Sequence, residues 1–121
     1  MKNKSIAQSF KNAFEGLYRA VVEERNMKIH ISAAIIVIIL GMLFNLDTPR
    51  WLAVVFAIGL VFVSELFNTV IELLTDMVTT EYSKQAKRVK DVSAAAVLVS
   101  AIISVIIGII VFLDPIINLL R

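Results

Sequence analysis

Long apolar runs dominate the pattern along this chain. Three segments that are nearly free of charge extend from Ile29 to Leu46, from Trp51 to Leu74 and from Val92 to Leu113. Each is close to the roughly 20 residues that an α-helix needs to cross about 30 Å of hydrocarbon. The pattern therefore predicts an all-α protein with three transmembrane helices, at about residues 29–46, 51–74 and 92–113.

Two polar links separate these runs. The first, from Asp47 to Arg50, is short and contains Pro49, so it predicts a tight turn. The second, from Thr75 to Asp91, is longer and polar. The pair Asp114-Pro115 is expected to break the third span near its far end, because proline lacks the amide hydrogen that continues a helix.

The N-terminal segment has a helical period of its own, and the pattern predicts an amphipathic helix at about residues 5–26. Its apolar positions fall within about 80° on a helical wheel; they are Ile6, Phe10, Phe14, Leu17 and Val21. Charged residues lie opposite, so we expect the helix to lie in the membrane interface. Glu24 falls on the apolar side, which directs its carboxylate towards the bundle.

Composition and charge support a membrane protein and predict its orientation. The chain has 121 residues, of which 59% are hydrophobic, more than a single small soluble core could bury. We treat residues 1–121 as one membrane-embedded domain. Residues 1–28 carry six lysines and arginines and residues 75–91 carry four, whereas Arg50 and Arg121 stand alone. The positive-inside rule then places the N-terminus in the cytoplasm and the C-terminus outside the inner (plasma) membrane.

A polar stripe runs along the second predicted span. From Glu65, the helical angles of Asn68, Glu72 and Asp76 are roughly −60°, −20° and +20°. A charged group at membrane depth costs at least about 2.5 kcal/mol, so such residues usually face a protein interior and carry function. The stripe begins at mid-membrane and emerges on the cytoplasmic side, where a soluble reactant can reach it.

These residue types suit phosphoryl transfer, which needs a divalent cation, a group that receives the acceptor's proton, and cations around the phosphates. The chain has no cysteine and one histidine, which favours a hard, oxygen-bound cation such as Mg²⁺. Glu24 and Glu72 are candidates to share it, Lys90 to contact phosphates, and Glu65 to meet a lipid hydroxyl. We assign His30, at a membrane boundary, a structural or interfacial role.

Three segments carry a resemblance to the prokaryotic diacylglycerol kinase family. Glu65–Asp76 (ELFNTVIELLTD) resembles its glutamate-rich motif, and Lys90–Val97 (KDVSAAAV) resembles its second motif at a matching separation. Glu23–His30 (EERNMKIH) resembles the segment that leads into its first span. The likeness covers nearly the whole chain, and the paired motifs are highly specific.

The resemblance implies a homotrimeric lipid kinase whose active sites are shared between subunits. It implies that Glu65 is the catalytic base, that Asn68 supports it, and that Glu24 and Glu72 bind magnesium. ATP is the implied phosphoryl donor, and the positions that match nucleotide contacts are Glu81, Tyr82, Ser83, Lys90 and Asp91.

Departures from the diacylglycerol branch indicate which acceptor to expect. That branch has an arginine and a tyrosine where this chain has Ser5 and Asn12, and a serine where it has Ala94. Together with Glu23–His30, these positions are more similar to the undecaprenol kinase branch. We therefore expect undecaprenol to be the acceptor, with diacylglycerol as the alternative.

Two readings from other classes remain open at this stage. An intramembrane carboxylate such as Glu65 also suits a small ion or solute transporter, which would be insensitive to ATP and Mg²⁺. A structural membrane subunit would tolerate Glu65→Gln without loss of function. The belt formed by Glu24, Glu81, Lys90 and Asp91 favours the kinase, because neither alternative needs it.

Overall fold

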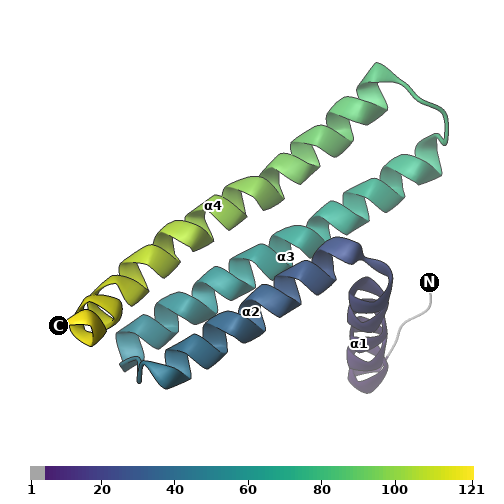
Figure 1. Ribbon diagram of the computed structural model, residues 1–121. Helices are drawn as coiled ribbons and strands as arrows, with labels where there is room; N and C mark the ends of the chain where they lie inside the picture. The colour runs from purple at the N-terminus through teal and green to yellow at the C-terminus, as the bar shows by residue number, and fades with distance from the viewer. Residues whose placement is uncertain (1–4) are drawn as a thin grey trace.

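The computed structural model describes residues 5–121 and contains four helices in this range and no strand. These are α1 (Ile6–Glu23), α2 (Arg25–Leu43), α3 (Thr48–Val78) and α4 (Lys84–Leu120). The helices α2, α3 and α4 lie side by side, and α1 leaves them at a steep angle (Figure 1). The predicted all-α class is confirmed. Lys2 and Lys4, two of the residues behind the orientation argument, lie outside the described residues.

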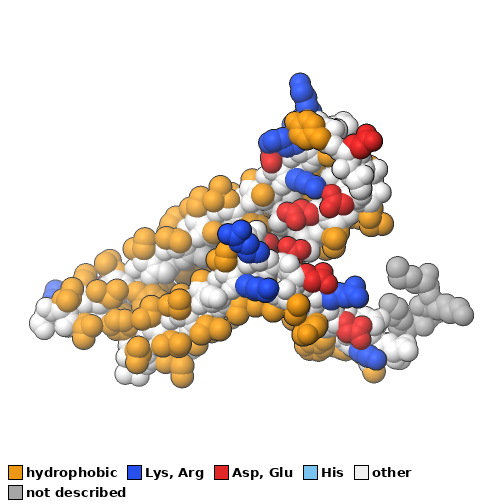
Figure 2. Space-filling view, turned by 45° about the vertical axis from the view of Figure 1, so that its right-hand side comes forward, with side chains coloured by type: hydrophobic (Ala, Val, Ile, Leu, Met, Phe, Trp, Pro, Cys, Tyr) orange, Lys and Arg blue, Asp and Glu red, His pale blue; other side chains and the backbone are white. Residues whose placement is uncertain are grey.

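Three of the helices, α2, α3 and α4, are long and apolar enough to cross a membrane. Many of their large apolar side chains are exposed, among them Phe56, Phe67 and Ile110. Hydrophobic side chains cover most of the visible bundle surface, while charged side chains gather at the end where α1 and the α3–α4 connection lie (Figure 2). Exposing such an apolar surface to water is unfavourable in free energy. The surface therefore indicates that lipid or further protein surrounds the bundle.

The α1 helix ends earlier than its hydrophobic period suggests. Glu24 has extended backbone angles (φ −94°, ψ 118°) and separates α1 from α2, which begins at the next residue. The chain therefore turns at Glu24, inside the range predicted for the interfacial helix. At the start of α1, the Ser5 hydroxyl accepts a hydrogen bond from the Gln8 amide, and the Gln8 side chain bonds back to the Ser5 amide.

The α2–α3 turn lies slightly earlier than predicted: residues 44–47 are non-helical, whereas the sequence placed the turn at Asp47–Arg50. Asn45 has a positive φ of 51°, and the Asp47 side chain caps α3 by accepting from the Arg50 amide at 3.1 Å. Pro49 lies in the first turn of α3, where a missing amide hydrogen costs no helical bond.

Helix fills most of the polar link between the second and third spans. Only Thr79–Ser83 is non-helical, because α3 continues to Val78 and the Ser83 hydroxyl caps α4 by accepting from Ala86 at 3.0 Å. The expected break at Asp114-Pro115 was wrong, since α4 continues through Pro115 to Leu120. Proline removes a single backbone bond, which a helix in an apolar bundle can tolerate.

The packed core lies at the end of the bundle away from the stripe. It consists of Leu46, Val54 and Val111, with Phe44 and Phe112 in an edge-to-face contact 6.1 Å apart. Along the middle of the bundle, polar contacts hold α3 to α4. Ser64 and Ser100 share a 2.6 Å hydrogen bond, and the Ser104 hydroxyl donates to the Ala57 carbonyl at 3.0 Å.

Candidate active site

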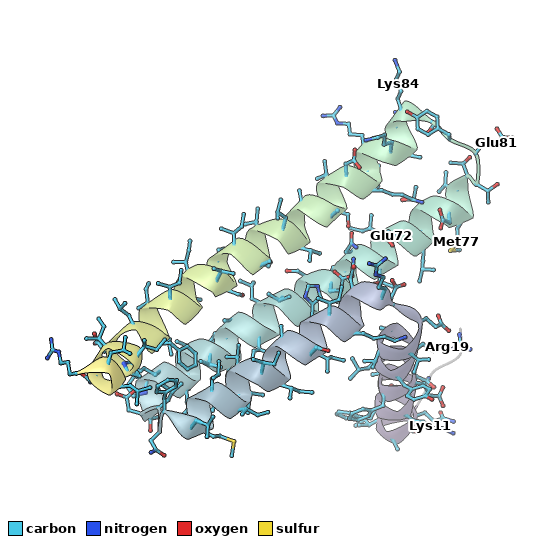
Figure 3. The ribbon with its side chains drawn as sticks, in the orientation of Figure 1. Lys11, Arg19, Glu72, Met77, Glu81 and Lys84 are labelled. Atoms are coloured by element: carbon cyan, nitrogen blue, oxygen red, sulfur yellow. The ribbon has the colours of Figure 1, made fainter. Side chains whose placement is uncertain are left out.

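Helix α3 places the stripe residues at graded depths. Glu65 and Asn68 are buried, at 1% and 4% exposure, Glu72 is half-buried, and Asp76 is exposed. Glu72 lies on α3 at the level of the α1–α2 junction (Figure 3). Helical spacing alone produces this alignment, and packing against neighbouring helices buries its deeper half.

The buried part of the stripe has few polar partners. Asn68 Nδ2 donates to Glu72 Oε1 at 3.1 Å, while Asn68 Oδ1 is buried without a partner among residues 5–121. Glu65 Oε2 is also buried and makes no hydrogen bond within the described chain. Buried polar atoms are normally satisfied, so unsatisfied ones often mark a place where a ligand or substrate binds.

His30 is the residue that sequence reasoning missed. Its Nε2 atom lies 3.5 Å from Glu65 Oε2, and both atoms are buried. His30 also lines an apolar cavity of about 300 Å³ between α2, α3 and α4, together with residues such as Ala34, Val61 and Ser104. The one available signal in the sequence was that His30 is the chain's single histidine and lies within an apolar run. That signal did not predict its contact with Glu65.

Glu24 reaches the same region from the junction of α1 and α2. Burial raises the pKa of Glu24 above its usual value, and the negative charges of Glu72, Glu65 and Glu23 raise it further. The structure thus brings Glu24 within electrostatic range of both stripe glutamates. No three acidic or histidine side chains of residues 5–121 converge closely enough to hold a metal on their own.

A second group of predicted residues surrounds the α3–α4 connection. A pocket of about 400 Å³ is lined there by all five residues expected to contact nucleotide: Glu81, Tyr82, Ser83, Lys90 and Asp91. Figure 3 shows Glu81 on the connection and Lys84 at the start of α4. The α3–α4 connection that lines the pocket lies at the end of the molecule where charged side chains gather (Figure 2).

Ion pairs order this pocket. Lys90 Nζ contacts Asp76 Oδ1 at 2.8 Å, and Lys87 pairs with Asp91. Asp76 belongs to the stripe, so its ion pair with Lys90 connects the stripe to the pocket. Asp76, the last residue of the stripe, therefore holds the lysine that was expected to contact phosphate.

Comparison with known proteins agrees with this arrangement. A family model described as prokaryotic diacylglycerol kinase matches residues 11–112. The chain is 41% identical to an undecaprenol kinase of Bacillus subtilis over 88% of its length and 86% of that protein. It is 34% identical to a diacylglycerol kinase of Synechocystis over 96% of its length and 67% of that protein.

A more distant relative is a diacylglycerol kinase of Escherichia coli, 27% identical over 78% of this chain and 77% of that protein. The family model covers the stripe, the second motif and the segment that leads into α2. The resemblance drawn from those three segments is confirmed: this chain belongs to the prokaryotic diacylglycerol kinase family.

Proposed function

We propose that this protein transfers the γ-phosphate of ATP to the hydroxyl group of undecaprenol within the membrane. The observation that carries the proposal is Glu65, a carboxylate only 1% exposed on a helix long and apolar enough to span a bilayer. A charged group at that depth is unfavourable in free energy, so a carboxylate retained there usually has a function. The relatives named above are an undecaprenol kinase and diacylglycerol kinases, and both undecaprenol and diacylglycerol are lipid alcohols.

Glu65 acts as the general base. Its carboxylate takes the hydroxyl proton while the alkoxide oxygen forms a bond to the γ-phosphorus, and the bond to the bridging oxygen of ADP breaks. Transfer in one step suits phosphoryl chemistry, where positioning and charge stabilisation supply most of the catalysis.

Asn68 and the α3–α4 pocket position the other reactants. Asn68 orients Glu72 through its 3.1 Å hydrogen bond. The nucleotide binds in the pocket near Lys90, which balances phosphate charge and is itself held by Asp76 at 2.8 Å. Tyr82 is 79% exposed there and offers a flat apolar surface to a base.

Glu24 at the α1–α2 junction and Glu72 on α3 fit Mg²⁺. Glu24 and Glu72 are oxygen donors, and burial together with the negative charges of Glu72, Glu65 and Glu23 raises the pKa of Glu24, so a bound cation would be favourable there. Mg²⁺ typically binds through one or two carboxylates and the substrate's own phosphates, so two glutamates suffice. When bound, it neutralises charge on the transferring phosphate.

Undecaprenol is the preferred acceptor for two reasons. The Bacillus subtilis relative with that name shares 41% identity and most of its length with this chain, against 34% and 27% for the diacylglycerol kinases named above. The positions Ser5, Asn12 and Ala94 also depart from the diacylglycerol branch. Diacylglycerol remains the alternative acceptor.

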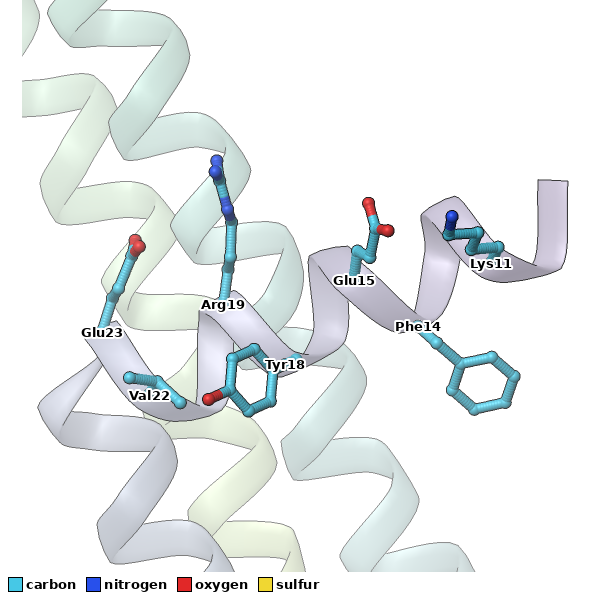
Figure 4. Close-up of a pocket in the computed structure, with 7 residues that line it drawn as sticks. All are labelled: Lys11, Phe14, Glu15, Tyr18, Arg19, Val22 and Glu23. Atoms are coloured by element: carbon cyan, nitrogen blue, oxygen red, sulfur yellow. The ribbon is translucent and has the colours of Figure 1, made fainter. Parts of the chain in front are cut away.

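The placement of α1 supports an interfacial role. Figure 4 shows Lys11, Glu15, Arg19 and Glu23 on one side of α1 and Phe14, Tyr18 and Val22 on the other. Such a helix lies in the membrane plane with its charged side towards headgroups and water. The N-terminus is then cytoplasmic, the C-terminus lies outside, and ATP reaches the stripe from the cytoplasm.

The functional unit is a homotrimer in which neighbouring subunits complete each site. The support comes from the family resemblance and from the exposed apolar surface of α2, α3 and α4. Partner subunits would cover part of that surface and supply polar contacts to the stripe. Cross-linking of the protein in micelles tests this assembly directly, with trimers expected as the largest product.

Phosphate transfer from γ-labelled ATP in mixed micelles tests the function. Undecaprenol and diacylglycerol are offered separately to the purified protein, to Glu65→Gln, and to Glu23→Gln as a matched control at an exposed glutamate. We expect label in undecaprenol, lost with Glu65→Gln and kept with Glu23→Gln. Stronger labelling of diacylglycerol would reassign the acceptor. If the protein is folded and neither lipid takes up label, the kinase proposal is refuted.

A further inference from the structure

The contact between His30 and Glu65 joins two helices at membrane depth. His30 Nε2 on α2 lies 3.5 Å from Glu65 Oε2 on α3, and neither atom has a hydrogen-bond partner within residues 5–121. This distance is slightly too long for a strong hydrogen bond, and a small rotation of either side chain closes it. Hydrogen bonds to catalytic groups are often long in the empty enzyme and tighten when substrate binds.

The chemistry of the two atoms fixes the direction of such a bond. A carboxylate oxygen only accepts, so the imidazole must carry its proton on Nε2 to face it without repulsion. Glu24 interacts electrostatically with both Glu65 and Glu72, and ionised Glu24 and Glu72 only accept hydrogen bonds. They favour a donor over an acceptor at the His30 position, and they offer the Glu65 carboxylate no stabilisation themselves.

We propose that His30 is a positioning residue: its Nε2–H donates to Glu65 Oε2 and holds Glu65 Oε1 towards the acceptor hydroxyl. The hydrogen bond fixes the carboxylate's orientation and stabilises its ionised form in an apolar site. The inference rests on the proposed function of Glu65 as base. It also explains why the only histidine of the chain lies at the border of the 300 Å³ apolar cavity, between the lipid-facing helices and the stripe.

Nuclear magnetic resonance can observe the bond without any enzymatic assay. Because the chain contains one histidine, ¹⁵N-histidine labelling gives one imidazole, whose two nitrogens report on one residue. We expect a protonated Nε2 whose proton exchanges slowly with water, and a clear change in the Nε2 shift and exchange rate in Glu65→Leu. An unprotonated Nε2, or signals unaffected by Glu65→Leu, would overturn the proposal even if the kinase assay succeeds.

Kinetics supply the second test. A hydrogen bond to a charged group is worth roughly 10-fold or more in rate, so His30→Leu should lower kcat by about that factor and leave the KM for lipid nearly unchanged. His30→Gln places an amide donor near the position of Nε2 and should recover most of the loss. Ser32→Ala is the matched control, because Ser32 Oγ donates only to the Lys28 carbonyl of its own helix, at 2.8 Å.

A coupled variant separates positioning from a general packing role. Glu65→Asp shortens the acid by one methylene and withdraws it from the ring while keeping a base. In that background His30→Leu should cost less than about 2-fold, because the bond is already lost. Equal losses in both backgrounds, or no rescue by His30→Gln, would make His30 a packing residue and leave the proposed function of Glu65 untouched.

Discussion

At the Arg50 end of the bundle, charged side chains form ion pairs. Arg50 Nη1 contacts Asp47 at 2.6 Å and Nη2 contacts Asp114 at 3.3 Å, beside the core formed by Leu46, Val54 and Val111. Around Glu65 the arrangement is the reverse. There, Glu65, Asn68 and His30 each bury a polar atom that has no hydrogen-bond partner in the described chain.

The difference shows how stability and function are divided along the same helices. Satisfied polar groups and close apolar packing stabilise the end near Arg50, while the Glu65 level keeps polar atoms that lower stability and remain available for substrates. Substitutions at the two ends should therefore affect different measurements. Four variants test this contrast, and they are given in order of decreasing expected effect.

Glu65→Leu should abolish transfer and stabilise the protein. Loss of a general base lowers rate by about 10²–10⁴-fold. An unsatisfied buried oxygen costs about 1–3 kcal/mol, and the 3.5 Å contact with His30 offsets only part of this cost, so removal of the carboxylate should raise the thermal midpoint in micelles. Activity and thermal unfolding measured on one preparation check both halves, with Glu23→Gln as the exposed control. A lower midpoint would mean that Glu65 stabilises the bundle, and the division of roles would fail.

Asn68→Leu should reduce activity with little change in stability. Its amide donates to Glu72 Oε1 at 3.1 Å, and a hydrogen bond to a charged group is worth about 1.5–3 kcal/mol, which corresponds to about 10–150-fold in rate. We expect this loss together with a higher Mg²⁺ concentration for half-maximal rate. In Thr69→Val, which loses only a bond to the Glu65 carbonyl of the same helix, the Mg²⁺ requirement should stay where it is. An unchanged Mg²⁺ requirement in Asn68→Leu would show that Asn68 has no part in metal binding.

Gly41→Ala should destabilise the opposite end and spare catalysis. A Cβ at this position would lie 2.6 Å from Trp51 Cη2 and 3.1 Å from Leu46 Cδ1, which forces the indole to move. Overpacking of this kind costs about 1–3 kcal/mol and should appear as a lower thermal midpoint. Gly16→Ala is the matched control, because nothing lies within 4 Å of its added Cβ. If the folded Gly41→Ala protein lost its specific activity, the two ends would be coupled.

Of the four variants, Glu24→Gln should change stability least. Whether it raises or lowers stability relative to the wild type depends on pH. The pKa of Glu24 is raised above 4.5 by burial and by Glu72, Glu65 and Glu23, so the folded protein binds this proton more tightly than the unfolded chain. The protonated group therefore favours folding at low pH, and stability falls as pH rises from about 4.5 through the raised pKa. Thermal midpoints across pH should decline less in Glu24→Gln.

Mg²⁺ adds an independent measurement to the same pair of proteins. In the wild type it should raise the thermal midpoint at neutral pH, because a bound cation offsets the charge at Glu24. This increase should shrink in Glu24→Gln and persist in Glu23→Gln. If Mg²⁺ raised the thermal midpoint equally in all three proteins, Glu24 would not be a metal ligand.

Much of the architecture follows from the sequence alone. Apolar runs of membrane-spanning length, the helical period before Glu24 and the alignment of Glu65, Asn68 and Glu72 on one helix face are consequences of local periodicity. The motifs Glu65–Asp76 and Lys90–Val97 were specific enough to indicate the family, which the comparison confirmed. Helix ends were less predictable, because caps at Ser83 and Glu24 depend on backbone angles and single hydrogen bonds.

Contacts between helices required the tertiary structure. Sequence spacing fixes which residues share a face of α3, but it does not say which residue of α2 contacts Glu65. His30 was therefore expected to have only a structural or interfacial role. The pairing of Lys90 with Asp76 and the approach of Glu24 to Glu72 have the same origin. Periodicity is a property of one helix, whereas the environment of a buried carboxylate depends on how several helices pack, and that packing decides its chemistry.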